Sequence, residues 1–452
     1  MINFKDLNYR RNSFKDKFCE NSKFEKRKFK KMGARKIGIL GVLFLFCITS
    51  FLNNSFSANA SSQSVLGIAR GGTNANSAER ASKNLGRIDS INYNNTDNEF
   101  PSSKATYDYI NYALNGKFVI AGGNQKVTEC LASKNCGEAN SWEGAMSSGG
   151  SANIWYNIAT DGKKFVVAGA NGLVSECLAA NNCALSSNWT SPIQTPQFIG
   201  TWQNIAYGNN EFIAVGGAMT ISFCKSSSNC GIASNWSTPT QTPSSSDTPA
   251  WWGVAYGNGK YIVTGHNGYI SQCLASTDCT IGSNWSQIVK VPGTTNYVDG
   301  FMYNDGKFIG VGDGGVTGCL ATSDCSVASS WTTVTKIPDG HGILRDITYG
   351  EGKYIAVGDA GYIAQCQDTN DCLNGQNWTG FSNSPGQNSY WISAAYGNGF
   401  FVTAGSIGKV SVCKASSNCS ISDNWSTAIT LEGINDSDGN WWNITYAKPG
   451  MS

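Results

Sequence analysis

Cysteine is the most regularly spaced reactive residue type in this sequence. Apart from Cys19 and Cys47, the sixteen cysteines form seven pairs with five residues between partners. A metal site needs more ligands than one pair supplies, and the only histidines, His266 and His341, fall in different repeats. The even count and fixed spacing therefore predict local disulfides formed in an oxidising compartment. The pairs are Cys130–Cys136, Cys177–Cys183, Cys224–Cys230, Cys273–Cys279, Cys319–Cys325, Cys366–Cys372 and Cys413–Cys419.

Other residues suited to catalysis are scarce. No Ser-His-Asp set can be read from two histidines, and neither a phosphate-binding loop nor an HExxH motif occurs. Asp313 and Asp359 could act as a carboxylate pair on a glycan if the fold brings them together. We therefore expect no enzymatic activity, no cofactor and no metal, with a glycan-active hydrolase as an alternative.

The cysteine pairs belong to a repeated unit that fills residues 117–430. The first cysteine of each copy recurs at steps of 47, 47, 49, 46, 47 and 47 residues. Such a period suits a blade of four antiparallel strands. Gly is abundant at 52 residues and only 14% of the chain is charged, which favours short strands and tight turns over helices.

The copy that starts at residue 251 shows the four expected strands. Apolar residues alternate over 252–256, and 260–265 is an almost continuous apolar run, as expected of a strand buried on both faces. A third strand is expected at 268–273, and a fourth begins near the Asn-Trp-Ser triplet at 284–286. The predicted fold class is all-β, a β-propeller.

The repeat is out of phase at the two ends of the chain. The first unit begins only at its second strand, 116–123, and an extra first strand stands at 440–447. That C-terminal strand would complete the first blade, closing a seven-bladed ring over 116–447 and removing two open sheet edges. An eight-bladed ring would instead require residues 109–114, which match the first strand poorly, to found their own blade.

Residues 1–60 are expected to be a basic leader and signal peptide. An uncharged run at 37–52 follows the basic residues, and Ala58 and Ala60 fit an A-x-A cleavage site. We expect export to the periplasm, the cell surface or the medium. An uncleaved leader would anchor the chain in a membrane, and Met32 is an alternative start.

The charge distribution argues against nucleic-acid binding. Residues 1–36 hold 13 Lys/Arg and 4 Asp/Glu, so the rest of the chain is mildly acidic. Only one arginine, Arg345, lies beyond residue 87. A protein that binds a phosphate backbone needs a basic surface.

Each copy carries a tryptophan shortly after its second cysteine. In the last copy this corner reads SSNCSISDNW, with Ser417, Asn418 and Trp425, and it resembles the Asp-box S-x-D-x-G-x-x-W of sialidase-like propellers with altered spacing and no glycine. Residues 349–363 also resemble units of bacterial secreted propellers, including photosystem-assembly-factor-like ones. The resemblance implies the propeller fold, but a sialidase clamps its substrate with an arginine cluster that this chain lacks. We expect the tryptophans to pack the blades rather than to stack sugars.

A short motif, LGIARGGTNANSAERASKNLG, lies upstream at 66–86. It resembles the collar motif of phage tail fibres, where such segments precede receptor-binding parts and can sit in trimeric stalks. The resemblance implies a stalk over 61–115 and homo-oligomerisation through it. The alternative is an exported linker with a small helix at 75–85.

The residue after the glycine that ends each second strand is expected to form a ring near the axis. These positions hold Gly123, Ala170, Gly217, His266, Asp313, Asp359 and Ser406. Polar variation on a constant scaffold favours recognition, so we predict that His266, Asp313, Asp359 and Ser406 bind a ligand, together with His341 and Trp391 from neighbouring connections. The alternative is that these are turn residues, because Asp and Ser favour turns.

Three functions remain open at this stage. The first is an exported binding or interaction module for adhesion or ligand recognition, with a protein or glycan as its partner. The second is a fibre-like receptor-binding component oligomerised through 61–115, and the third is the glycan-active hydrolase. Five Asn-Trp-Ser/Thr triplets match glycosylation sequons, but their constant place in the repeat favours a role in turn geometry.

Overall fold

A computed structural model of the chain describes residues 111–144, 146–147, 153–244, 249–338, 342–386, 390–431 and 439–449. The leader, the collar-like motif at 66–86 and His341 lie outside these residues, so the expectations about them stay predictions. Within the described ranges, no helix combines the length and the hydropathy that crossing a bilayer requires.

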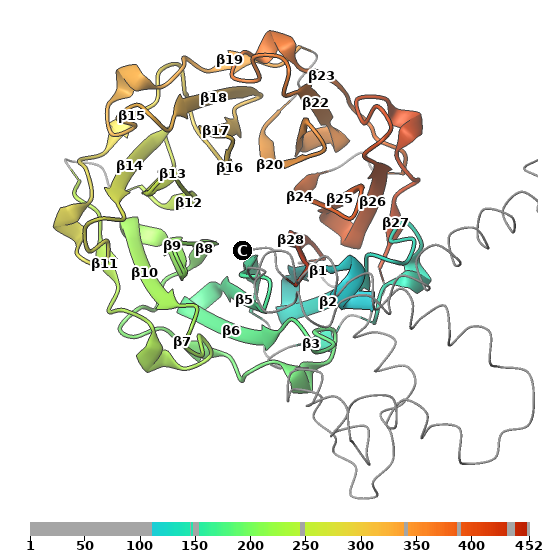
Figure 1. Ribbon diagram of the computed structural model, residues 1–452, viewed down its shortest axis with the longest axis horizontal. Helices are drawn as coiled ribbons and strands as arrows, with labels where there is room; N and C mark the ends of the chain where they lie inside the picture. The colour runs from blue at the N-terminus through green and yellow to red at the C-terminus, as the bar shows by residue number, and fades with distance from the viewer. Residues whose placement is uncertain are drawn as a thin grey trace, which may run out of the picture. The chain divides into compact units, whose positions relative to one another are not determined.

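The described residues form seven four-stranded antiparallel sheets set as blades around a central axis (Figure 1). The innermost strands are β28 (Trp441–Ala447), β4 (Trp155–Thr160), β8 (Trp202–Gly208), β12 (Trp251–Gly257), β16 (Gly300–Asn304), β20 (Leu344–Gly350) and β24 (Trp391–Gly397). The second strands are β1 (Lys117–Gly122), β5 (Lys164–Gly169), β9 (Glu211–Gly216), β13 (Lys260–Gly265), β17 (Lys307–Gly312), β21 (Lys353–Gly358) and β25 (Phe400–Gly405). This arrangement confirms the predicted seven-bladed propeller.

The third strands are about as long as the second, whereas the fourth strands have only two or three residues. The third strands are β2 (Lys126–Leu131), β6 (Leu173–Leu178), β10 (Thr220–Lys225), β14 (Tyr269–Leu274), β18 (Gly315–Leu320), β22 (Ile363–Gln367) and β26 (Lys409–Lys414). The fourth strands are β3 (Met146–Ser147), β7 (Ile193–Gln194), β11 (Thr240–Gln241), β15 (Val289–Lys290), β19 (Thr335–Lys336), β23 (Thr379–Phe381) and β27 (Ile429–Thr430).

Short 3₁₀ turns lie between many of these strands. Those between second and third strands are η5 (Gly123–Gln125), η7 (Ala170–Gly172), η9 (Gly217–Met219), η13 (Asp359–Gly361) and η15 (Ser406–Gly408). Those before the repeated tryptophans are η6 (Ala139–Ser141), η8 (Ser186–Asn188), η10 (Ala233–Asn235), η11 (Gly282–Asn284), η12 (Ala328–Ser330), η14 (Gly375–Asn377) and η16 (Ser422–Asn424). Residues 111–115 are helical rather than extended, so they found no eighth blade.

The ring is closed by pairing between the last strand and the first. β28 runs antiparallel to β1, with Lys117 opposite Ala447 and Ile120 opposite Ile444. The first blade is therefore built from β28, β1, β2 and β3, as the phase of the repeat predicts (Figure 1). β1 thus has a partner on its inner edge, and β28 takes the innermost place in the first blade.

The hydrophobic cores lie between neighbouring blades. Trp202, which is fully buried at the start of β8, packs with Val166 of the preceding blade and Phe212 of its own. The closing interface is built in the same way, because Trp441 packs with Val402 of the seventh blade. Burial of large apolar side chains across every blade boundary stabilises the ring as a whole.

The inner strands also interlock through tyrosine and glycine. A Cβ added at Gly397 of β24 would lie 2.2 Å from the Tyr446 ring of β28, and one at Gly208 would lie 2.2 Å from Tyr256. Glycine is required at these positions because the tyrosine of the next blade lies against the backbone.

The corner between third and fourth strands contains all seven predicted disulfides, which are confirmed. The indole nitrogen of each repeated tryptophan donates to the carbonyl of the second cysteine of its own blade at 2.6–3.0 Å. These tryptophans, from Trp142 to Trp425, are 1–7% exposed and so pack the blades. The sequon asparagines donate to the carbonyl six residues earlier.

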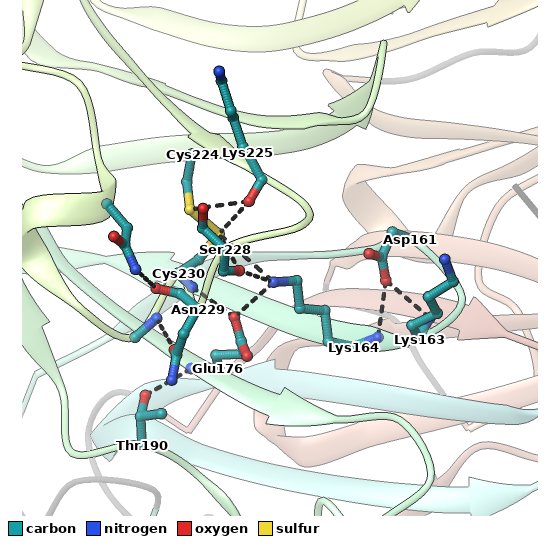
Figure 2. A network of polar contacts seen from close by, with 12 residues as sticks. Asp161, Lys163, Lys164, Glu176, Thr190, Cys224, Lys225, Ser228, Asn229 and Cys230 are labelled. Carbon is teal, nitrogen blue, oxygen red and sulfur yellow. Dashed lines mark hydrogen bonds and ion pairs between the residues drawn. A yellow bond between two sulfur atoms is a disulfide. The ribbon is translucent and has the colours of Figure 1, made fainter. Parts of the chain in front are cut away.

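The disulfide loops are also docking points for the preceding blade. Figure 2 shows Lys164 at the start of β5 reaching the loop of the next blade. Its ammonium donates to the Ser228 carbonyl and pairs with Glu176 at 3.0 Å. The same Glu176 carboxylate accepts the backbone N–H of Cys230 at 2.7 Å. Lys117 and Glu129 form an equivalent buried pair at 2.6 Å.

We predict that Lys164→Met lowers the free energy of unfolding by about 3–5 kcal/mol, because it leaves the buried Glu176 carboxylate without its counter-charge. The matched control is Lys163→Met, at an exposed neighbouring position, with an expected effect within about 0.5 kcal/mol. Chemical denaturation with the disulfides intact measures both. Equal, small losses in the two variants would contradict this role of Lys164.

A second prediction concerns the closing interface. Gly397→Ala should cost about 1–3 kcal/mol, because the added methyl group collides with the Tyr446 ring. A Cβ at Gly217 meets nothing within 4 Å, so Gly217→Ala should change stability by less than about 0.5 kcal/mol. Thermal unfolding compares the two variants. A Gly397→Ala protein as stable as the Gly217→Ala protein would show that β28 does not pack as described.

Candidate functional site

The seven inner strands line a cavity on the propeller axis. Its volume is about 540 Å³, and every blade contributes residues to its wall. That volume falls within the range usual for small-ligand sites. The axial cavity is therefore the concave feature to which all seven repeats contribute.

One position of the repeat dominates the mouth of this cavity. It directly follows the buried residue at the start of each inner strand, such as Trp155 or Trp202. In six blades it is the extra residue of a β-bulge against the second strand, so its side chain leaves the paired register and lines the axial cavity. We call this set the mouth ring. Its members are Tyr156, Gln203, Trp252, Asp299, Arg345, Ile392 and Trp442.

Aromatic side chains make up much of the mouth ring and its surroundings. Trp252 stacks on His266 with ring centroids 5.0 Å apart, and His266 meets Tyr297 edge-on at 5.1 Å. On another part of the ring, Tyr156 and Trp442 meet edge-on at 5.1 Å. Burial lowers the pKa of His266, so its imidazole is neutral at neutral pH.

The two charged members of the mouth ring, Arg345 and Asp299, differ in their hydrogen-bond partners. Arg345 donates to Asp359 at 2.8 Å, and its guanidinium lies 5.3 Å from the Tyr390 ring centre. The Oδ1 atom of Asp299 is buried and accepts no hydrogen bond from the residues that the structure describes. Burial raises the pKa of Asp299 to about 7; Arg345 opposes this rise, and the charges of Asp313 and Asp359 add to it.

The predicted ring of residues after the second-strand glycine lies one strand farther from the axis than we expected. These residues form the turns between second and third strands, because the inner strand is the first of each blade. The side chains of Asp313, Asp359 and Ser406 bind the connection that leads into the inner strand. Asp313 accepts from the Thr295 and Asn296 backbone N–H groups at 2.9 and 2.7 Å.

Asp359 and Ser406 have similar roles. Asp359 accepts from the Ile343 N–H at 3.2 Å, and the Ser406 hydroxyl accepts from the Tyr390 N–H at 3.1 Å. Burial pushes the pKa of Asp313 upwards, but its hydrogen bonds from Asn296, Thr295 and Tyr297 outweigh burial and hold the pKa below its ordinary value. These carboxylates are thus engaged in organising loops.

Trp391 does not line the mouth, which corrects the prediction that it adds ligand contacts. It opens β24, is fully buried, and donates its indole N–H to Ser384 at 2.6 Å. Of the six predicted binding residues, His266 is therefore the one that contacts a mouth-ring aromatic, and Asp359 the one that holds the mouth-ring arginine. His341 lies outside the described residues.

Sequence reasoning missed the mouth ring itself. A signal for it was present, because this position changes residue type from copy to copy while the residue before it is tryptophan in five of the seven blades. We had instead expected the residue after the second strand to lie nearest the axis, whereas the first strand of each blade is the innermost. Among the described residues, no cluster of His, Cys, Asp and Glu is arranged to hold a metal ion.

A second polar layer lies one residue below the mouth ring. The Ser393 hydroxyl donates to Asp346 Oδ2 at 2.6 Å, and Asn443 donates to the Ser393 oxygen at 3.1 Å, which links the sixth, seventh and first blades. Asp346 also accepts from the Ala394 and Ile347 N–H groups. Burial nevertheless raises the pKa of Asp346 to about 6.

Comparison with known proteins adds little beyond the fold. No protein-family description matches the sequence, and a search of curated proteins finds no match either. Among solved structures, the WD40 repeats of RRP9 align with a TM-score of 0.48 and 11% identity, over 66% of this chain and 84% of that chain. The U3-55K structure aligns with a TM-score of 0.43 and 10% identity, over 57% and 77%.

We predict that Asp346 makes stability depend on pH. Because its pKa is raised in the folded state, its protonated form is favoured there, and its contribution to stability falls as pH rises from about 4 to 7. Asp346 is partly open to the cavity, which limits the effect to about 1–2 kcal/mol. As the pH rises from about 4 to 7, the free energy of unfolding of Asp346→Asn should therefore increase by about 1–2 kcal/mol relative to that of wild type.

The control for this titration is Asp423→Asn, at an exposed position on η16. Urea unfolding at several pH values gives all three stability curves. If the Asp346→Asn curve runs parallel to that of wild type, the buried carboxyl does not titrate as described.

Proposed function

We propose that this chain is an exported, non-catalytic propeller that binds its ligand at the mouth ring, in adhesion or ligand recognition. The observation that carries the proposal is the variation at one repeat position. The mouth ring holds six residue types over seven blades, whereas the tyrosine four residues later recurs in six blades. A repeated scaffold that carries different side chains at a position facing a cavity is the pattern of a recognition surface.

The cysteines support the exported part of the proposal. Seven disulfides require an oxidising environment, which an exported chain meets. This agrees with the predicted signal peptide.

The engagement of Asp313 and Asp359 argues against the hydrolase alternative, which would use these two carboxylates as its pair. A general acid or base must present a free carboxyl group to the substrate. Asp313 and Asp359, which we considered for a hydrolase, are both used by N–H donors of their own connections. The fibre-like alternative depends on residues 61–115, and no observation in the described part of the chain favours it.

A glycan and protein array tests the proposal on the exported protein. The double variant Tyr156→Ala/Trp442→Ala removes the edge-on aromatic pair of the mouth ring. We expect it to lose at least tenfold in affinity for the array ligands of wild type, because aromatic anchors dominate such sites.

The control alters two exposed apolar side chains beside the disulfide loops, as Leu185→Ala/Ile281→Ala. It should bind like wild type. Full binding by the mouth variant, or loss confined to the loop variant, would place recognition elsewhere.

A further inference from the structure

We propose that the wall of the mouth formed by Trp252 and Asp299, with Tyr297 beside Trp252, binds an organic ammonium group, primary or quaternary. This inference rests on the proposed function, since it names the chemistry that the same mouth recognises.

The first step is that the Asp299 carboxylate has a buried oxygen without a hydrogen-bond donor among the described residues. The other carboxylates near the mouth are satisfied: Asp313 and Asp346 each accept several N–H or O–H donors, and Asp359 pairs with Arg345. Asp299 lines the same cavity with a buried oxygen that accepts no hydrogen bond from the described residues. A buried carboxylate without a partner is costly, and a cation brought to it relieves that cost.

The second step is the aromatic environment. Trp252, one blade before Asp299 in the mouth ring, lines the cavity, and its ring centroid lies 6.0 Å from that of Tyr297. Faces of Trp and Tyr attract cations, and aromatic walls beside a carboxylate are suited to ammonium ligands.

The third step is the charge balance of the groups that face Asp299. Arg345 is the one cation of the mouth ring, and its charge is opposed by Asp359 at 2.8 Å. His266 is uncharged near neutral pH because burial lowers its pKa. Lys336 donates to the Asp313 carbonyl. With Asp313, Asp346 and Asp359 also nearby, the mouth favours a cation over an anion.

The pH dependence follows from Asp299. Its pKa is raised to about 7 in the free protein, and a bound cation favours the ionised form. Affinity for an ammonium ligand should therefore rise between pH 6 and pH 8.

The experiment measures binding of choline and n-butylammonium to the full chain by titration calorimetry. The control ligand is 3,3-dimethylbutan-1-ol, which has the shape of choline without its charge. We expect at least one of the two cations to bind tenfold or more tightly than the alcohol at pH 8, and more weakly at pH 6. Choline represents a quaternary headgroup and n-butylammonium a lysine side chain, so their ranking identifies the source.

Asp299→Asn keeps the shape of the side chain and removes its charge. It should lower affinity for the cation at least tenfold and abolish the pH dependence, whereas Asp423→Asn should do neither. Should Asp299→Asn fail to fold, the comparison of choline with the alcohol and the pH series on wild type still decide the question.

Three results would overturn the inference: equal binding of choline and the alcohol, no binding of either cation, or binding of neutral glucose in their place. If array ligands still depend on Tyr156 and Trp442 in that case, the proposed function stands and only the ammonium chemistry fails.

Discussion

The backbone pairing of β28 with β1 is the constraint on which this structure depends. The two strands lie at opposite ends of the described chain, and their hydrogen bonds convert a row of seven sheets into a ring. An open row would expose a strand edge and a half-covered hydrophobic core at the first and seventh blades. The mouth ring also requires closure, because Trp442 comes from β28 whereas Tyr156 belongs to the following blade.

Two devices repeat around the closed ring and hold it rigid. Within a blade, the disulfide and the tryptophan N–H bond fix the corner between third and fourth strands. Between blades, lysines such as Lys164 and Lys353 at the start of the second strand reach carbonyl groups of the next disulfide loop. Each loop thus serves its own blade and the one before it. This local and nearest-neighbour stabilisation is typical of repeat architectures.

The repeat made most of the fold predictable. Cysteine spacing indicated the number of blades and the disulfides, and the phase of the repeat at 116–123 and 440–447 indicated the closing strand. The site was less predictable, because the strand facing the axis cannot be identified from periodicity alone. Trp391 looked like a surface aromatic in the sequence, yet it fills the interface between blades. The state of Asp299 depends on charges of the next blade as well as its own, Arg345 and Asp359 among them, which no single repeat encodes.

Hydrogen–deuterium exchange of the backbone amides tests closure most directly. If the ring is closed as described, the paired amides of β28 and β1 exchange as slowly as those of β12 and β13, by opening of the whole domain. Exchange of the β28 amides that is orders of magnitude faster, with β12 and β13 still protected, would show that the C-terminal strand is not part of the first blade.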